Sequence, residues 1–575
     1  MTSNYDKFPS VRVRGYDTHA HKGYPAIQKV ISSHITTPFT LVIDCYPGVR
    51  VDEVLEHLVK PLGIHRVLIS EDAFVPGEII TDRIQRHLTE DRVFGILSNH
   101  RFEEFLDRET LARMRREIDN ASEPVCVIGV GASLITRGDV LIYADLARWE
   151  IQQRYRSLEI GNWKCQNYAE DILRKYKRGY FVEWRMADRH KRQLFRDFDY
   201  LLDTNLRFEP RLVSSEALLA GLRQTVNQPF RTVPFFDPGV WGGQWMKTVC
   251  DLDPKQANYA WCFDGVPEEN SLLLQYDDVQ VQIPSINVVF EQARALLGEA
   301  VHARFGLEFP IRFDFLDTMD GQNLSLQVHP LTEYIQEQFG MHYTQDESYY
   351  ILDAKAEGTV YLGVKEGIDP QAMISDLKRA QAGEIRFPDE DYINCFPAKK
   401  HDHFLIPAGT VHCSGKNTMI LEISATPYIF TFKLWDWDRV GLDGLPRPVH
   451  IDHGKQVIQF DRDTRWVKSN LINACSIVRE EAGHLEEHTG LHEREFIETR
   501  RHTFDRPIEL STEGSVQMLN LVEGEQVIVE SPDGLFDPFI VHYAETWIMP
   551  EAIQRYRLRP GCLGSIKVIR AYVRH

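Results

Sequence analysis

The sequence has no long apolar run and no paired cysteines. No stretch approaches the ~20 consecutive apolar residues that a membrane-spanning helix requires, and the first residues lack the apolar core of a secretory signal. The nine cysteines are scattered singly without a CxxC pair, which is typical of reduced thiols in a cytoplasm. We therefore expect a soluble cytoplasmic protein that does not associate with membranes.

Positive charge is in short supply. Lysine and arginine number 65 against 84 aspartate and glutamate residues, so the formal net charge at pH 7 is −19. A field of this sign opposes binding to nucleic acid or to an anionic membrane surface. It still allows a small anionic substrate to bind at a local basic patch. The sequence does not indicate an oligomeric state.

The first part of the chain alternates between apolar runs and helical patterns. Buried strands are expected at 40–44 (TLVID), 66–70 (RVLIS), 125–130 (VCVIGV) and 140–143 (VLIY). Segments 51–60 and 102–119 lie between them and place apolar residues three and four apart, as amphipathic helices do. A chain of 575 residues needs several hydrophobic cores. We predict a doubly wound α/β domain over residues 1–205, followed by further domains.

This first domain lacks the phosphate-binding loop GxxxxGK[ST]. The predicted strand 40–44 is followed by Gly48, but by no Lys-Ser or Lys-Thr pair to reach a phosphate and Mg²⁺. A second glycine-rich stretch, GVGAS at 129–133, is a weak signal of the same kind. The segment 172–205, from ILRKYKRGYFVEWRMADRHKR to DYLLDTN, resembles nucleoside kinases of the uridine kinase type. The resemblance implies a degenerate kinase-like domain that binds a ligand or regulates, without phosphate transfer.

Short strand-like segments dominate from residue 234 onward, separated by Gly, Pro, Asn and Asp. Strands are expected at 311–317, 324–330, 347–354, 359–364, 403–409, 419–425 and 431–437, and in four runs between 515 and 573. One helical insertion is expected at 370–381 (PQAMISDLKRAQ). Many short strands broken by turn residues favour all-β jelly-roll domains, which we place at 206–460 and 461–575.

Four side chains in the first β-rich region have the pattern of a metal site. Gln327 and His329 are two apart in a predicted strand, so their side chains leave the same face. Glu347 opens the next strand, and His412 ends PAGTVH, whose proline and glycine shape the preceding turn. Two imidazoles, a carboxylate and an amide oxygen suit a divalent cation, with Zn²⁺ favoured, and leave a position for water or substrate.

The same residues carry a family resemblance. VWGGQWMK, FPIRFDFLD, LSLQVHP, ESYYILDA, HFLIPAGTVHCSG, ILEIS and WDWDR follow, in this order, the segments of the class I mannose-6-phosphate isomerases. The later segment from VEGEQVIVES to IKVIRAYV resembles the second cupin that ends those enzymes. The resemblance implies a metal-binding catalytic cupin (jelly-roll) domain at 206–460 and a second cupin at 461–575. It also implies one Zn²⁺ per chain, bound by the four residues above. The implied activity is the isomerisation of a sugar phosphate, mannose-6-phosphate to fructose-6-phosphate.

Two positions depart from the family pattern. Lys433 stands where these enzymes usually carry an arginine before the WDWDR run, whereas Arg439 ends that run as in the family. The resemblance implies that Lys433 and Arg439 stabilise oxyanion or phosphate charge, although lysine lacks the planar fork of arginine. Gln345 replaces a lysine that the family tends to carry two residues before the glutamate. The sequence does not identify the proton-transfer base.

Two other functions fit parts of the pattern. Two histidines and one glutamate also form the facial triad of non-haem iron oxygenases. The substitutions at 345 and 433 also fit a non-catalytic sugar-sensing protein. Lys399 and Lys400 fit either a phosphate contact or a solvated basic turn. For His401 and His403 we expect an exposed turn rather than a role beside the metal.

Overall fold

The computed structural model describes residues 3–425, 430–442, 444, 447–490, 492 and 494–575. Contacts group the chain into two compact units. The α/β unit comprises residues 10–225 and 271–291, and the β unit comprises residues 1–9, 226–270 and 292–575. The α/β unit therefore extends to 225 rather than to the expected 205, and it takes in a later segment that the sequence assigned to the β-rich region. The division of the β-rich region at 460 stays a prediction.

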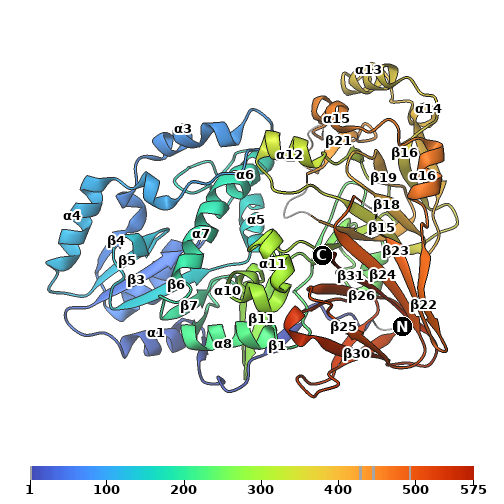
Figure 1. The fold of residues 1–575 in the computed structure, drawn as a ribbon. Coiled ribbons are helices and arrows are strands. Elements are labelled where there is room, and N and C mark those ends of the chain that lie inside the picture. Colours follow the sequence, from blue (N-terminus) through green and yellow to red (C-terminus); the bar gives the residue numbers. More distant parts are fainter. Residues whose placement is uncertain (1–2, 426–429, 443, 445–446, 491, 493) are drawn as a thin grey trace. The chain divides into compact units, whose positions relative to one another are not determined.

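A seven-stranded sheet organises the α/β unit (Figure 1). Its strands, in spatial order, are β2 (Ala20–Lys22), β8 (Arg211–Ser214), β7 (Tyr200–Asp203), β6 (Val140–Asp145), β3 (Thr40–Cys45), β5 (Val125–Gly129) and β4 (Arg66–Ile69). The strands from β7 to β4 run parallel, whereas β8 and β2 are antiparallel to their neighbours. Strands β5 and β6 are buried along their whole length, which explains why their sequences are apolar throughout rather than alternating. The four predicted strands correspond to β3, β4, β5 and β6, but β4 is only partly buried.

Helices connect the parallel strands, because a parallel pair requires a crossover connection. They are α1 (Tyr24–Ser32), α2 (Val51–Val54), α3 (Gly77–Leu88), α4 (Arg108–Asp119), α5 (Arg148–Arg156), α6 (Ile172–Arg178) and α7 (Trp184–Leu194). The boundary lies beyond 205 because β8 turns back to pair with β7, and α8 (Ser215–Thr225) follows at once. A three-stranded sheet of β1 (Ser10–Arg12), β11 (Ser271–Tyr276) and β12 (Val279–Pro284) adds the later segment to this unit.

Two facing sheets, which we call the first sheet pair, form the first half of the β unit. The six-stranded sheet contains β18 (His403–Ile406), β15 (Glu347–Ala354), β20 (Thr418–Ser424), β13 (Arg312–Asp317), β10 (Trp261–Gly265) and β9 (Phe235–Asp237). The five-stranded sheet contains β17 (Ile393–Pro397), β16 (Thr359–Val364), β19 (His412–Ser414), β14 (Leu326–Val328) and β21 (Phe432–Trp435). Helix α13 (Pro370–Gln381) is the predicted insertion. Further helices that the sequence analysis did not predict are α9 (Trp245–Val249), α10 (Ile286–Leu297), α11 (Glu299–Phe305), α12 (Thr332–Phe339), α14 (Asp389–Tyr392), α15 (Ile451–Val457) and α16 (Thr464–Asn470).

A second sheet pair completes the β unit. One sheet contains β22 (Ser476–Glu481), β23 (His484–Gly490), β24 (Ile497–Phe504), β31 (Ile566–Val573), β26 (Gln517–Glu523) and β29 (Thr546–Met549). The other contains β25 (Ile508–Ser511), β30 (Arg555–Pro560), β27 (Gln526–Glu530) and β28 (Phe539–His542). Leu519, Trp547 and Val568 of the first sheet share one buried cluster with Val527 and Leu558 of the second. The apolar face of each sheet thus packs against the other, as in a sandwich or barrel.

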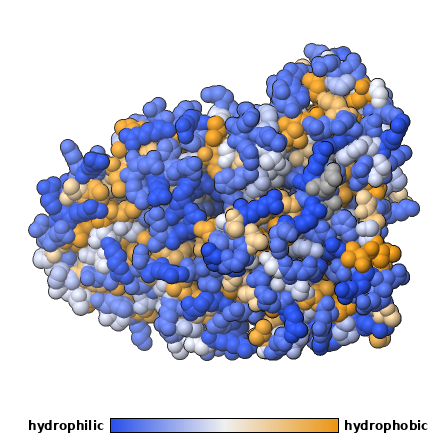
Figure 2. Space-filling view, in the orientation of Figure 1, coloured by the Kyte–Doolittle hydropathy of each residue, from blue (hydrophilic) through white to orange (hydrophobic). Residues whose placement is uncertain are grey.

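Hydrophilic side chains cover most of the face shown in Figure 2, and hydrophobic side chains form separate groups between them. None of the helices in the described part of the chain combines the length and the apolar character that crossing a bilayer requires.

Candidate metal centre

His329, Glu347 and His412 meet in the interior of the first sheet pair. One ligand atom from each lies within 4.8 Å of the others, and all three residues are buried. Nε2 of His329 is 3.1 Å from Oε2 of Glu347, and Nε2 of His412 is 2.8 Å from Oε1 of the same carboxylate. Among the described residues, this is the one group of three or more His, Cys, Asp or Glu side chains close enough to share a metal ion.

Strand register brings two more of the predicted residues beside this group. Gln327 of β14 is paired with His412 of β19 on one side and with Lys433 of β21 on the other. Paired residues on neighbouring strands point to the same face of a sheet. The amide nitrogen of Gln327 lies 3.2 Å from Nε2 of His412, and a 180° amide rotation would present its oxygen instead. Glu347 approaches from the opposing sheet, where it begins β15.

Backbone carbonyl groups fix both histidine rings. Nδ1 of His329 lies 2.9 Å from the carbonyl oxygen of Phe430, and Nδ1 of His412 lies 2.9 Å from that of Thr410. A carbonyl only accepts hydrogen bonds, so each Nδ1 carries a proton and each Nε2 is directed toward Glu347. Nε2 of His329 and Oε1 of Glu347 are buried without a hydrogen-bond partner. These converging nitrogen and oxygen atoms could hold a divalent cation.

Glu347 is held as a carboxylate. Burial by itself raises the pKa of Glu347, but the facing His329 and His412 hold it well below its usual range. Gln345 donates from Nε2 to Oε2 of Glu347 at 2.8 Å. The glutamine that replaces the family's lysine therefore orients the carboxylate rather than adding a positive charge.

A second buried carboxyl group, which the sequence analysis missed, lies next to Glu347. Oε1 of Glu422 is 3.4 Å from Nε2 of Gln345, and Glu422 is paired with Tyr349 of β15 and Asp314 of β13. Burial, followed by the nearby Glu347 and Asp314, raises the pKa of Glu422 well above its usual range. The sequence signal that could have identified Glu422 is its place as the one charged residue in the otherwise apolar ILEIS strand. Glutamate is rarely buried unless it has a partner, so a glutamate in such a strand indicates a functional or paired group.

The two predicted catalytic residues differ in their surroundings. Lys433 is half-buried in β21 and shares the row of Gln327 and His412. Arg439 instead donates from Nη1 to the backbone oxygen of Asn323 at 2.8 Å and from Nε to that of Asp436 at 3.1 Å. These bonds stabilise the turn after β21. A role of Arg439 toward the substrate stays a prediction.

The basic segment 399–403 is tied to the second sheet pair. Nζ of Lys400 and Nε2 of His401 lie 2.9 and 2.8 Å from Oε2 of Glu523. The exposed turn expected for His403 was wrong, because this residue begins β18 opposite Tyr350 and is fully buried. Burial, followed by the charge of Arg501, lowers the pKa of His403 to about 3.

In the α/β unit, the glycine-rich stretch 129–133 surrounds a carboxylate of the chain itself. The backbone nitrogen of Ser133 donates to Oδ2 of Asp44 at 2.8 Å, and its hydroxyl donates to the same oxygen at 2.5 Å. Nε2 of His190 lies 2.9 Å from that oxygen. Asp44 stands near the carboxyl end of β3, the edge where open α/β sheets bind ligands. The backbone donors that a phosphate would need at this stretch are therefore taken up by two carboxylates of the chain, Asp44 and Glu71.

The chain is similar to known proteins in two respects. Residues 23–227 match a family described as a domain of unknown function, DUF8485. The chain is 25% identical over 233 residues to mannose-6-phosphate isomerase ManA of Bacillus subtilis, a match that spans 40% of this chain and 68% of ManA. It is 26% identical over 227 residues to mannose-6-phosphate isomerase of Streptococcus mutans, which spans 39% of this chain and 65% of that protein. The matched part is homologous to mannose-6-phosphate isomerases.

Among solved structures, mannose 6-phosphate isomerase from Bacillus subtilis superposes with a TM-score of 0.49 at 17% sequence identity. That superposition covers 60% of this chain and 99% of the other.

Proposed function

We propose that this chain is a zinc-dependent aldose–ketose isomerase of a sugar phosphate, which converts mannose-6-phosphate to fructose-6-phosphate. The convergence of His329, Glu347 and His412 on one point carries the proposal. Gln327 borders that point, and Lys433 lies next to it in the same row. Homology to mannose-6-phosphate isomerases supports the reaction class.

The reaction moves a proton between adjacent sugar carbons without net oxidation. A base removes the C2 proton of the open-chain aldose, and the C1 carbonyl oxygen takes up a proton as the enediol forms. Return of a proton to C1 and loss of the O2 proton then give the ketose. Zinc, when bound, supplies Lewis-acid polarisation of the sugar oxygens on which negative charge develops.

Lys433 is assigned to charge stabilisation. Lys433 stands on the strand next to Gln327, in the row that also contains His412. A fixed positive charge near a developing oxyanion lowers the barrier, because the group needs no reorganisation when the charge appears.

Glu422 is assigned to proton transfer. Its carboxyl group is buried beside Glu347, and its raised pKa keeps a proton on it closer to neutral pH than an ordinary glutamate would. A buried carboxyl group with a raised pKa beside the reacting atoms is suited to general acid–base catalysis. No ligand role is assigned to it, so its replacement by glutamine separates proton transfer from metal binding.

Metal analysis of the purified protein, combined with an assay of fructose-6-phosphate formation from mannose-6-phosphate, tests the proposal. We expect about one zinc per chain and metal-dependent turnover, both lost in His412→Ala. The matched control is His342→Ala, which removes a histidine whose side chain is 69% exposed. Zinc binding without turnover of any sugar phosphate would favour the sugar sensor instead. Turnover that requires Fe²⁺ and consumes O₂ would favour an oxygenase.

A further inference from the structure

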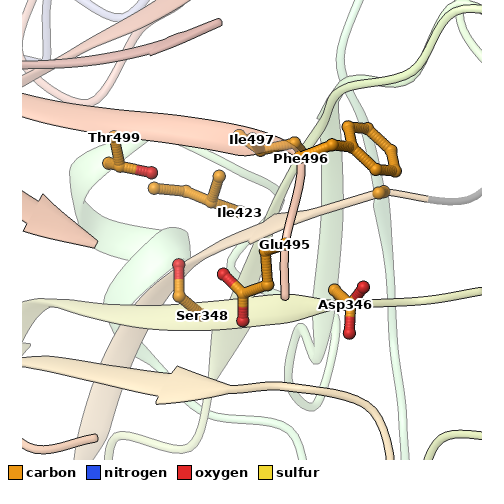
Figure 3. Close-up of a pocket in the computed structure, with 8 residues that line it drawn as sticks. Asp346, Ser348, Ile423, Glu495, Phe496, Ile497 and Thr499 are labelled. Atoms are coloured by element: carbon orange, nitrogen blue, oxygen red, sulfur yellow. The ribbon is translucent and has the colours of Figure 1, made fainter. Parts of the chain in front are cut away.

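Strand β15 carries polar side chains on both of its faces. Glu347 points toward the histidines, whereas Ser348 points the opposite way because side chains alternate along a strand, and Asp346 immediately precedes the strand. Ser348 and Asp346 line a small pocket between the two sheet pairs (Figure 3). Glu495 and Thr499 reach the same pocket from the second sheet pair. The remaining lining residues are Ile423, Ala425, Phe496 and Ile497.

Two carboxyl groups share this pocket without a counter-charge in hydrogen-bond contact. Figure 3 shows the carboxyl group of Glu495 between Ser348 and Asp346. Glu495 is 7% exposed, and its Oε1 has no hydrogen-bond partner. Its Oε2 accepts a long bond of 3.3 Å from the backbone of His492. In the described part of the chain, neither Asp346 nor Glu495 forms an ion pair.

The charge of Arg462 reaches both carboxyl groups, but Nη1 of this residue forms its hydrogen bonds outside the pocket. Nη1 of Arg462 donates to the carbonyl oxygens of Pro407 and Ala408, each at 2.7 Å. Burial, followed by the charge of Asp346, raises the pKa of Glu495 well above its usual range. A buried carboxylate beside a second one is costly unless a positive charge lies between them.

We propose that this pocket binds one divalent cation of the hard, oxygen-preferring class, Ca²⁺ or Mg²⁺, through the carboxylates of Asp346 and Glu495. The hydroxyl groups of Ser348 and Thr499 supply further oxygen donors, and two carboxylates balance the charge of one divalent ion. The pocket has room for one water-sized occupant, and the partly exposed Asp346 connects it with solvent.

The donor chemistry separates this pocket from the histidine-containing centre on the other face of β15. Its polar lining consists of carboxyl and hydroxyl groups, which suit Ca²⁺ and Mg²⁺, whereas imidazole favours zinc and other transition metals. An ion bound here would join β15 of the first sheet pair to the segment that leads into β24 of the second.

Thermal unfolding of the full chain tests the proposal. Protein freed of hard cations on a chelating resin and reloaded with zinc is titrated with CaCl₂, MgCl₂ and NaCl at constant ionic strength. We expect the Tm to rise by several degrees with Ca²⁺ or Mg²⁺, and not with Na⁺. The rise should persist in Glu357→Gln, which removes an exposed carboxylate of the same sheet pair, and in the zinc-free His412→Ala. It should vanish in Glu495→Gln.

Glu495→Gln should also be more stable than the wild type in cation-free solution, because a neutral amide costs less to bury in this pocket than an acidic group without a hydrogen-bond partner on Oε1. Ser348→Ala, which keeps both charges, should weaken Ca²⁺ affinity in a calorimetric titration several-fold at one site per chain. If the Tm of the wild type does not rise with Ca²⁺ or Mg²⁺, the proposal is wrong, and the pocket holds water and a protonated Glu495 instead. An equal rise in Glu495→Gln, or the same rise with Na⁺, would overturn it as well.

Discussion

Lys433 lies across from Gln327 in the five-stranded sheet, which puts its Cβ ~5 Å from that of the residue bordering His412. For an ammonium that reaches to ~5 Å from a developing oxyanion, Coulomb attraction gives about 3 kcal/mol at an effective dielectric constant of ~20. In other enzymes, removal of one preorganised group that stabilises an oxyanion raises the activation free energy by a similar ~3–4 kcal/mol. Lys433→Ala is therefore expected to lower kcat by roughly 10²-fold or more while leaving the metal content unchanged.

Steady-state isomerisation of mannose-6-phosphate, with metal analysis of each variant, measures this effect. Lys433→Arg should retain more activity than the alanine variant, because it keeps the charge and restores the planar fork of donors. The matched control is Lys416→Ala, which removes an exposed lysine from the loop between β19 and β20 and should leave kcat unchanged. Near-wild-type turnover by a fully metallated Lys433→Ala would refute the reasoning, since a charge at that position would then not act on the reacting oxygens.

Four further outcomes are expected. His329→Ala and His412→Ala should each lose the bound metal, and full occupancy in both would exclude the site. Glu422→Gln should keep the metal but lose at least ~10²-fold in kcat; unchanged turnover would remove Glu422 from proton transfer. The full chain with Mg²⁺-ATP should not phosphorylate nucleosides or sugars, because Asp44 and Glu71 occupy the backbone donors of 129–133, and clear Mg²⁺-dependent transfer would contradict this. The pKa of His403 is about 3 in the folded protein and 6.5 for an ordinary histidine, so as the pH falls the unfolded chain takes up this proton before the folded protein does. Its contribution to stability should be complete above pH 6.5 and fall by about 1.4 kcal/mol per pH unit toward pH 3. Urea unfolding between pH 7 and 4 should show a weaker pH dependence in His403→Phe, and equal slopes would count against the assignment.

Local sequence patterns anticipated the parts of the fold that depend on near neighbours. The buried strands of the α/β unit are continuous apolar runs, and helix α13 covers the expected residues. The order QxH, Glu and PxGxxH predicted that His329, Glu347 and His412 share one site, and the structure places these three residues in contact. In each case the information lies within a few residues, as alternation, a turn or a helical period.

Features that depend on pairing between distant segments were not predictable in this way. The row of His412, Gln327 and Lys433 comes from the register of three strands that are far apart in sequence. The boundary at 225 comes from the pairing of β8 with β7. Strands β22 and β23 were not predicted because both contain several charged residues and β22 is exposed along its length. Neither sequence therefore shows the apolar pattern of a buried strand. The burial of Glu422 depends on strands that enclose it from both sides.

The grouping of residues 1–9 with the β unit has a consequence for biosynthesis. The backbone nitrogen of Asp6 donates to Oε1 of Glu545, a partner 539 positions later, and the hydroxyl of Tyr5 donates to Asp264. At ~5–20 residues per second, the ribosome takes roughly 30–110 s to make the intervening chain. Asp264, the partner of Tyr5, is made about midway through that time, so this segment can dock in part before its last partner exists. The hydrogen bond between Asp6 and Glu545 can form only after nearly the whole chain has been made, and it therefore belongs to a late step of folding.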